Sequence, residues 1–220
     1  MTTTQEPDTS QSKRPLSQQS RVGSASFRSL RQVLAADAYR YTGRLGFRSF
    51  VYCWREVPGF HYTFWLRLCV FARRRLYLCF GPLQFFKWRM RRCMYRYGIA
   101  IPYATKIGPG FAIHHFGGIV INEHAILGGN CNISQGVTIG KANRGKRAGC
   151  PTIGDNVYIG PGAKIFGHIM IGNNVAVGAN CVVTRDVPDN AVVAGVPGRV
   201  ISYDGTAGYV NRTNYPDVDE

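Results

Sequence analysis

The sequence predicts a mostly β fold in which short strands wind into stacked coils, preceded by a helical region. Aliphatic residues recur at every sixth position through the second half of the chain, and many of them are followed by glycine. A period of six matches neither an α-helix nor a single strand, whereas a short strand and a turn, repeated and stacked, produce it. The composition also changes near residue 98, where a basic aromatic segment gives way to nearly neutral repeats.

Residues 1–30 are predicted to be a disordered basic tail. The segment is rich in Ser, Thr and Gln and has no periodic apolar face. No apolar segment follows Lys13 and Arg14, which argues against a secretory signal. The seven cysteines lack metal-ligand spacing, so we expect reduced thiols, a cytoplasmic chain and no metal.

Residues 31–98 are predicted to be a helical, aromatic and basic cap. Residues 1–100 hold 18 Lys and Arg against 4 Asp and Glu, while residues 101–220 hold 9 against 8. One helix is expected around residues 66–72 and a second after the Gly81-Pro82 break, to about Tyr95. The interpretations left open are a cap alone, a cap with peripheral contact at the inner face of the plasma membrane, and nucleic-acid binding. No motif supports the last, so no nucleic-acid partner is expected.

Residues 99–202 are predicted to form the coils, with residues 203–220 as a C-terminal tail. The chain holds its six-residue spacing from Ile101 to Ile119, slips by two residues, and resumes the spacing at Leu127. Ile139 and Ile153 are 14 residues apart, which fits two units with two residues to spare. The surplus is assigned to a loop within residues 140–150, which is rich in Lys, Arg and Gly.

These repeats resemble the hexapeptide-repeat acyltransferases. The most specific segments are Gly117-Gly118-Ile119, Gln135-Gly136-Val137 and Gly195-Val196-Pro197, which are similar to the serine O-acetyltransferase branch and its relatives in polysaccharide gene sets. The resemblance implies a left-handed parallel β-helix, a homotrimer, and acetyl-CoA as co-substrate.

The resemblance assigns the general base to His115, in the segment Ile113-His114-His115-Phe116-Gly117. The reaction needs a group of near-neutral pKa that takes a proton from an acceptor hydroxyl. The register favours His115 over His114. The resemblance also makes Glu123 a catalytic residue, because it occupies the position of an acidic residue near the family's acceptor site and would orient the acceptor or tune His115. The alternative is a solvated charge at the slip.

Three departures from the serine-specific pattern weaken that reading. Ala100 stands where the family carries an Asp that orients the base, His114 stands at the acidic position before the base, and Cys150 replaces a second functional His. We therefore expect the acceptor to be a sugar or exopolysaccharide precursor. The alternatives are L-serine and a non-catalytic β-helix scaffold.

The donor side matches the family better. The resemblance implies that basic residues bind the coenzyme A phosphates and that turns follow its pantetheine arm. The residues so assigned are Lys141, Lys146, Arg147, Gly160, Pro161, Ala179, Thr184, Arg185 and Arg199. The sequence thus predicts an acetyl-CoA-dependent O-acetyltransferase that uses direct attack, without a covalent enzyme intermediate.

Overall fold

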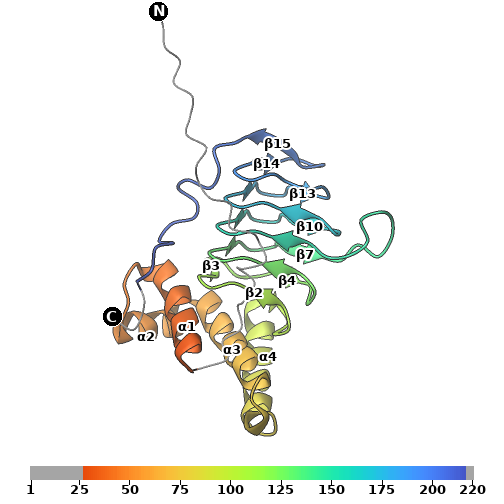
Figure 1. Cartoon of the computed structure of the whole chain (residues 1–220). Helices are drawn as coiled ribbons and strands as arrows, with labels where there is room; N and C mark the ends of the chain where they lie inside the picture. The colour runs from red at the N-terminus through yellow and green to blue at the C-terminus, as the bar shows by residue number, and fades with distance from the viewer. Residues whose placement is uncertain (1–26, 217–220) are drawn as a thin grey trace, which may run out of the picture.

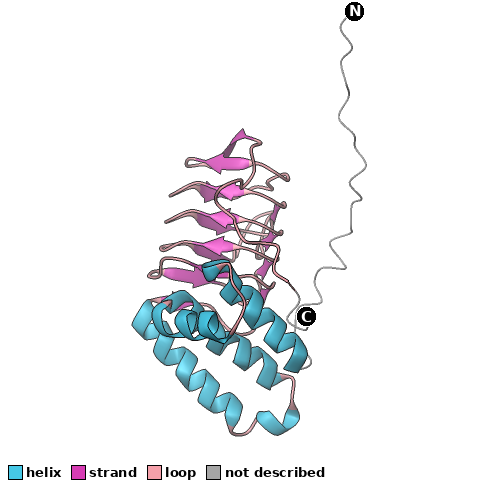
Figure 2. Ribbon diagram, turned by 90° about the vertical axis from the view of Figure 1, so that its left-hand side faces the viewer, coloured by secondary structure: helices cyan, strands magenta, loops and turns pink. Residues whose placement is uncertain are grey.

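Helices form a base below a column of short strands (Figures 1 and 2). The structure is a computed structural model that describes residues 27–216, apart from the side chain of Leu76. The predicted disordered tail therefore lies almost wholly outside the described residues. The helices are α1 (Phe27–Thr42), α2 (Phe47–Glu56), α3 (Pro58–Arg73), the 3₁₀ helix η2 (Leu76–Leu78) and α4 (Pro82–Tyr97).

Within the described residues, the strands form three sheets that run along the column. Sheet A is β1-β4-β7-β10-β13, sheet B is β11-β8-β5-β2, and sheet C is β15-β14-β12-β9-β6-β3. The strands are β1 (Ile99–Ala100), β2 (Lys106–Ile107), β3 (Ala112–Ile113), β4 (Ile119–Ile121), β5 (Ile126–Leu127), β6 (Asn132–Ile133), β7 (Thr138–Gly140), β8 (Thr152–Ile153), β9 (Tyr158–Ile159), β10 (Lys164–Phe166), β11 (Met170–Ile171), β12 (Ala176–Val177), β13 (Val182–Val183), β14 (Val192–Ala194) and β15 (Arg199–Ser202). Apart from β15, which is antiparallel to β14, the pairing is parallel. The column is the left-handed parallel β-helix that the repeats and the resemblance predicted.

The aliphatic ladder forms the core of the column. Ile121 pairs with Ile139, Ile139 with Ile165, and Ile165 with Val183. All four are at most 2% exposed. Successive strands contribute to sheets A, B and C in turn, so each coil contains three six-residue units. Each such buried side chain contributes about 1.5–3 kcal/mol of transfer free energy.

The predicted position of the two-residue slip was wrong. Ile119 pairs with Ile99, and it is Ile121 that continues the ladder toward Ile139. The two extra residues therefore lie between Ile113 and Ile121, in the turn from sheet C to sheet A. Ile119 is nevertheless buried, because residues 119 and 121 point to the same side of a strand.

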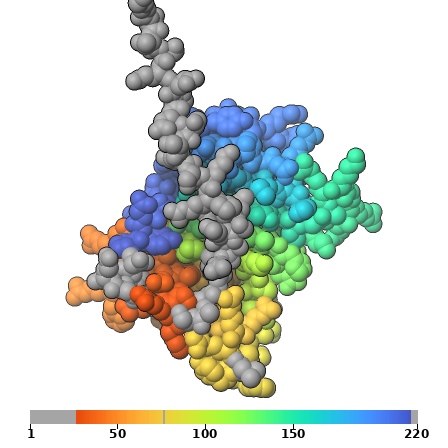
Figure 3. Space-filling view, viewed as in Figure 1, coloured from red at the N-terminus to blue at the C-terminus, as the bar shows by residue number. Residues whose placement is uncertain are grey.

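The predicted count of units around the inserted loop was also wrong. Ile139 lies in sheet A and Ile153 lies in sheet B, the next sheet around the coil. A single unit joins them, so the loop carries eight residues beyond the usual six. Its base is closed by two backbone hydrogen bonds between Ala142 and Gly149, at 2.9 and 2.8 Å. The loop projects from the column (Figures 1 and 3).

One corner of the column, between sheets B and C, is held by stacked asparagines. Asn130, Asn156, Asn174 and Asn190 have φ between 54° and 61°, a left-handed conformation that Asn tolerates better than most residues. Their side-chain amides bond from coil to coil at 3.0, 3.1 and 3.1 Å. This ladder satisfies most of the amide groups while the backbone turns.

The helical base closes the N-terminal end of the column. Tyr62, Trp65 and Leu66 of α3 join the same core as the aliphatic ladder. A Cβ on Gly59 would clash with the carbonyl oxygen of Ile113, so α3 reaches sheet C because residue 59 is glycine. No helix among residues 27–216 is long and apolar enough to cross a membrane.

A buried ion pair ties the base to the first coil. Arg67 donates from Nε and Nη2 to the two carboxylate oxygens of Asp37, at 3.0 and 3.2 Å. It also donates to the carbonyl oxygens of Ile107 and Gly108 at 2.7 and 2.6 Å, and Asp37 accepts from the Phe111 N–H at 2.9 Å. Burial raises the pKa of Asp37, and Arg67 opposes this shift.

Candidate functional site

His115 lies on the turn that the two extra residues enlarge. The turn connects β3 of sheet C to β4 of sheet A, and His114, His115 and Phe116 are all exposed on it. Gly117 and Gly118 follow with φ of 107° and 64°, a backbone conformation that favours glycine. The longer turn thus presents two imidazoles at the surface of the column.

Two tyrosines from the helical base hold this turn. Tyr41 of α1 accepts a hydrogen bond from the Ile113 N–H at 2.7 Å and donates to the Ile113 carbonyl oxygen at 3.3 Å. Burial raises the pKa of Tyr41, so its hydroxyl stays protonated and can donate. On the other side, the Tyr97 ring of α4 lies 5.5 Å from the Phe116 ring. The residues on both sides of His114 and His115 are therefore braced.

The two histidines differ in their surroundings. The His114 ring packs edge-on against Tyr41, with centroids 5.2 Å apart. Although His114 is exposed at the surface, partial desolvation of its ring, followed by the charge of Arg40, lowers the pKa of His114. His115 is exposed, and no hydrogen bond among the described residues includes its ring. The two rings thus differ in the aromatic contact, which His114 makes with Tyr41 and which His115 lacks among the described residues.

Further predicted residues share the corner of His115. We call the turns between sheets C and A the histidine corner; they are residues 114–118, 134–137, 160–163 and 178–181. Backbone hydrogen bonds of 2.8–2.9 Å stack them: Gly136 N–H to Gly117, Gly162 N–H to Gln135, and Asn180 N–H to Pro161. The structure thus places Gly160, Pro161 and Ala179 in line above His115.

Other predicted residues lie on a different corner. We call the turns between sheets A and B the loop corner; they are residues 122–125, 141–151, 167–169 and 184–186. This corner carries Glu123, Lys141, Lys146, Arg147, Thr184 and Arg185. Arg147 pairs with Asp186 at 3.1 Å, and its carbonyl oxygen accepts from the His168 N–H at 2.8 Å. The inserted loop is therefore fixed to the turns above it.

The acceptor-side residues of the loop corner keep polar partners. Glu123 is exposed and lies 3.6 Å from His124. The Cys150 thiol lies 3.3 Å from Oδ1 of Asn122, the neighbour of Glu123. Replacement of the expected histidine by Cys150 therefore leaves a polar cluster at this corner.

The two corners flank sheet A, so they do not form a single site within this chain. His115 and Glu123 lie at opposite ends of β4, whose three residues extend about 10 Å. Arg199 lies elsewhere again, exposed in β15 beside Ala194 of β14. The sequence grouped these residues by motif and could not show that they occupy separate edges.

Sequence reasoning missed the residues that support the histidine turn. Tyr41 lies 72 positions before Ile113, and Tyr97 belongs to a helix that was assigned only to the cap. Neither carries a motif, and aromatic residues are abundant in this segment. Only the packing of the base against β3 and β4 brings them to the turn.

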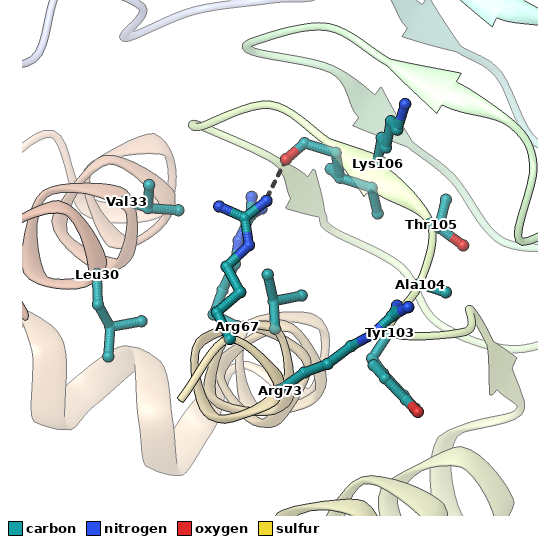
Figure 4. Close-up of a pocket in the computed structure, with 11 residues that line it drawn as sticks. Leu30, Val33, Arg67, Arg73, Tyr103, Ala104, Thr105 and Lys106 are labelled. Carbon is teal, nitrogen blue, oxygen red and sulfur yellow. Dashed lines mark hydrogen bonds between the residues drawn. The ribbon is translucent and has the colours of Figure 1, made fainter. Parts of the chain in front are cut away.

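A separate cavity of about 380 Å³ lies between α1, α3 and the segment before β2 (Figure 4). Leu30, Val33 and Ile107 supply apolar walls, while Arg73 and Lys106 are exposed basic residues at its edge. The cavity lies beside sheet B and contains none of the predicted site residues. Within residues 27–216, no group of three His, Cys, Asp or Glu is arranged to hold a metal ion.

Comparisons with known proteins identify similar chains. Residues 150–185 match the family model described as bacterial transferase hexapeptide (six repeats). A serine acetyltransferase of Synechococcus elongatus is 46% identical over 108 residues, covering 49% of this chain and 44% of that protein. The chain thus spans about half the length of the curated relatives it matches.

Solved structures extend the similarity into the helical base. The Neisseria gonorrhoeae serine acetyltransferase in complex with serine is 32% identical, with a TM-score of 0.63 over 79% of this chain and 69% of that chain. The Brucella abortus serine acetyltransferase in complex with coenzyme A is 31% identical, with a TM-score of 0.61 over 78% of this chain and 66% of that chain.

These relatives overturn the predicted sugar or exopolysaccharide-precursor acceptor. They are serine acetyltransferases, which the sequence analysis had kept as the alternative. The prediction was wrong because it gave three replaced side chains, at Ala100, His114 and Cys150, more weight than the rest of the repeat domain. The polar cluster of Cys150, Asn122 and Glu123 shows that the replacement at residue 150 does not make this corner apolar.

Three observations point to the same family. They are the coil register, the enlarged histidine turn, and the similarity to the gonococcal structure over more than two thirds of the length of that chain. The chain belongs to the hexapeptide-repeat O-acetyltransferase family, which includes the serine acetyltransferases.

Proposed function

We propose that the protein transfers an acetyl group from acetyl-CoA to the hydroxyl of L-serine. The observation that carries this proposal is the exposed His115 on a braced, enlarged turn. That turn occurs in a chain whose similar structures include a serine acetyltransferase bound to serine. The coenzyme A complex of another relative supports the choice of donor.

In the proposed reaction His115 acts as the general base. It removes the proton from the serine hydroxyl as the oxygen attacks the thioester carbonyl carbon. The tetrahedral intermediate then collapses and the carbon–sulfur bond breaks. The leaving coenzyme A thiolate accepts from the imidazolium the proton that came from serine. Backbone N–H groups beside the turn stabilise the oxyanion. The products are O-acetylserine and coenzyme A.

The two corners take different parts of the substrates. On the loop corner, Glu123 pairs with the amino group of serine, and Lys141 and Lys146 attract the phosphates of coenzyme A. Arg147, Thr184 and Arg185 of the same corner, and Arg199 of β15 outside both corners, provide further polar contacts to the donor. On the histidine corner, the backbone of Gly160, Pro161 and Ala179 lines the pantetheine arm. These roles rest on the family resemblance and on the positions of the residues.

The separation of the corners supports a homotrimer. Threefold closure would place the histidine corner of one copy beside the loop corner of the next, which completes a site that one protomer leaves divided. We expect sedimentation equilibrium to give three times the 24.4 kDa mass of one chain.

Mixing subunits tests whether the trimer shares its sites. Subunits with His115→Ala and subunits with Glu123→Ala should each be inactive alone. After dissociation and random reassembly, about a quarter of the sites would combine two intact corners. Recovery of activity supports shared sites, whereas an active monomer, or a mixture that stays inactive, contradicts them.

Serine specificity is tested by the release of thiol from acetyl-CoA. We expect a kcat/KM for L-serine above roughly 10⁴ M⁻¹s⁻¹, within the usual range of enzymes. L-Alanine has the same charged groups but no hydroxyl, and it should give no release above background. Release with another hydroxyl compound but none with L-serine would reject the acceptor and leave the acetyl transfer standing.

The proposed location is the cytoplasm. The seven cysteines form no disulfide in the structure, and five of them lie in the cores of the base or the column: Cys53, Cys69, Cys93, Cys131 and Cys181. Reduced, buried thiols of this kind are typical of cytoplasmic proteins.

A further inference from the structure

The α3–α4 hairpin has an exposed surface that the cap role does not require. The hairpin lies at the end of the molecule away from β15 (Figures 1 and 2). Leu83, Met90 and Cys93 of α4 pack inward and account for the attachment of the helix. We call the exposed aromatic residues of the hairpin, with two exposed arginines beside them, the hairpin surface; it consists of Tyr77, Phe80, Phe85, Trp88, Arg91, Arg92 and Tyr95.

The five members of the hairpin surface on α4 make one stripe along that helix. On α4, residues 85, 88, 92 and 95 follow at intervals of three and four, which is one face of a helix. Phe80 at the tip is 87% exposed and Trp88 is 48% exposed. Large aromatic residues concentrated on one outward face are a feature of interaction surfaces, because a solvated helix face is ordinarily polar.

The charge around this stripe has one sign. Residues 57–122 contain ten Lys and Arg and no Asp or Glu. The acidic residues of the described helical base are Asp37, which is buried against Arg67, and Glu56, which lies 3.8 Å from Arg55. The Arg92 guanidinium lies 4.9 Å from the centre of the Trp88 ring, so cation and aromatic ring are presented together. The partner of this surface must therefore be negatively charged and must accept apolar rings.

An anionic phospholipid surface has both properties. Aromatic rings insert at the level of the headgroups, and arginines pair with their phosphates. The 16 residues of α4 extend about 24 Å, enough to lie along a membrane but in a helix that does not cross it.

We propose that the hairpin surface docks on a membrane that contains anionic phospholipid, with α4 parallel to the bilayer and Phe80 and Trp88 inserted. This proposal does not depend on acetyl transfer. A nucleic-acid duplex would satisfy the charge but gives no reason for three exposed aromatic rings to lie beside two arginines on one face of α4.

Flotation with lipid vesicles tests the proposal on the full-length protein. Binding should occur with vesicles of phosphatidylcholine and phosphatidylglycerol, be much weaker with phosphatidylcholine alone, and fall as salt screens the charges. A basic residue near such a surface is worth about 1 kcal/mol, so Arg91→Gln should weaken binding about fivefold and Arg91→Gln/Arg92→Gln about thirtyfold. Trp88→Ala should weaken it about tenfold even at low salt.

The matched control is Arg144→Gln in the inserted loop. It removes the same charge from an exposed arginine outside the hairpin, and binding should stay within about twofold of the wild type. Thiol release without vesicles should be unchanged in Arg91→Gln/Arg92→Gln. A protein that ignores anionic vesicles, binds neutral ones equally well, or is displaced from vesicles by a DNA duplex overturns the membrane proposal. If the wild-type protein binds anionic vesicles but releases no thiol from acetyl-CoA, only the proposed serine acetyl transfer is contradicted.

Discussion

The substitution His115→Ala is expected to lower kcat/KM for acetyl transfer about 10²–10⁴-fold, the usual loss when a general base is removed. The fold should survive, because His115 is exposed and no hydrogen bond among the described residues depends on its ring. Thiol release from acetyl-CoA in the presence of L-serine measures the effect, and circular dichroism with sedimentation checks folding and assembly.

The adjacent histidine provides the control for this prediction. His114→Ala removes a ring that packs on Tyr41, so we expect a smaller loss of activity. If His114→Ala abolishes transfer while His115→Ala leaves it near the wild-type level, the assignment of the base is reversed. Burial and Arg40 lower the pKa of His114, so this ring would then be a base that stays neutral at lower pH.

The substitution Asp37→Ala is expected to destabilise the protein by about 3–5 kcal/mol. It removes one partner of a buried ion pair and leaves Arg67, whose side chain is 7% exposed, without its counter-charge. The Phe111 N–H also loses its acceptor. The expected result is a large fall in the free energy of unfolding, measured by urea denaturation at one fixed protein concentration, since assembly contributes to stability.

An exposed ion pair of the same base serves as the comparison. Arg55 and Glu56 lie 3.8 Å apart with side chains that are mostly solvated. Glu56→Ala should therefore change the free energy of unfolding by no more than about 1 kcal/mol. Equal effects of Asp37→Ala and Glu56→Ala would show that the buried pair does not hold the base on the first coil.

The coil architecture could be predicted because its signal is local. Each inward position such as Ile133 or Val177 requires an aliphatic side chain, whatever the rest of the chain does. The exact register of the strands was harder to predict from the sequence. Ile119 and Ile121 are both buried, so hydrophobicity alone did not reveal which of them continues the ladder. The loop was located correctly, but its eight extra residues were miscounted because spacing does not show which sheet comes next.

The candidate site could be predicted only in part. The segment around His115 carries a recognisable motif, and the structure places it on an exposed turn. The predicted acceptor was wrong because Ala100, His114 and Cys150 were weighed by residue identity alone. The hydrogen bond between Cys150 and Asn122 joins residues 28 positions apart, so the sequence did not reveal it.

The sequence by itself determined the repeat, its six-residue unit, the inserted loop and the basic aromatic character of the base. These properties follow from the spacing and type of neighbouring residues. Only the tertiary structure decided which residues meet. Tyr41 reaches Ile113 and Arg67 reaches Asp37 through packing of helices on the first coil, while His115 and Glu123 are divided between two corners. The physical reason is that a turn in each six-residue unit redirects the chain, so residues close in sequence separate and residues one coil apart become neighbours.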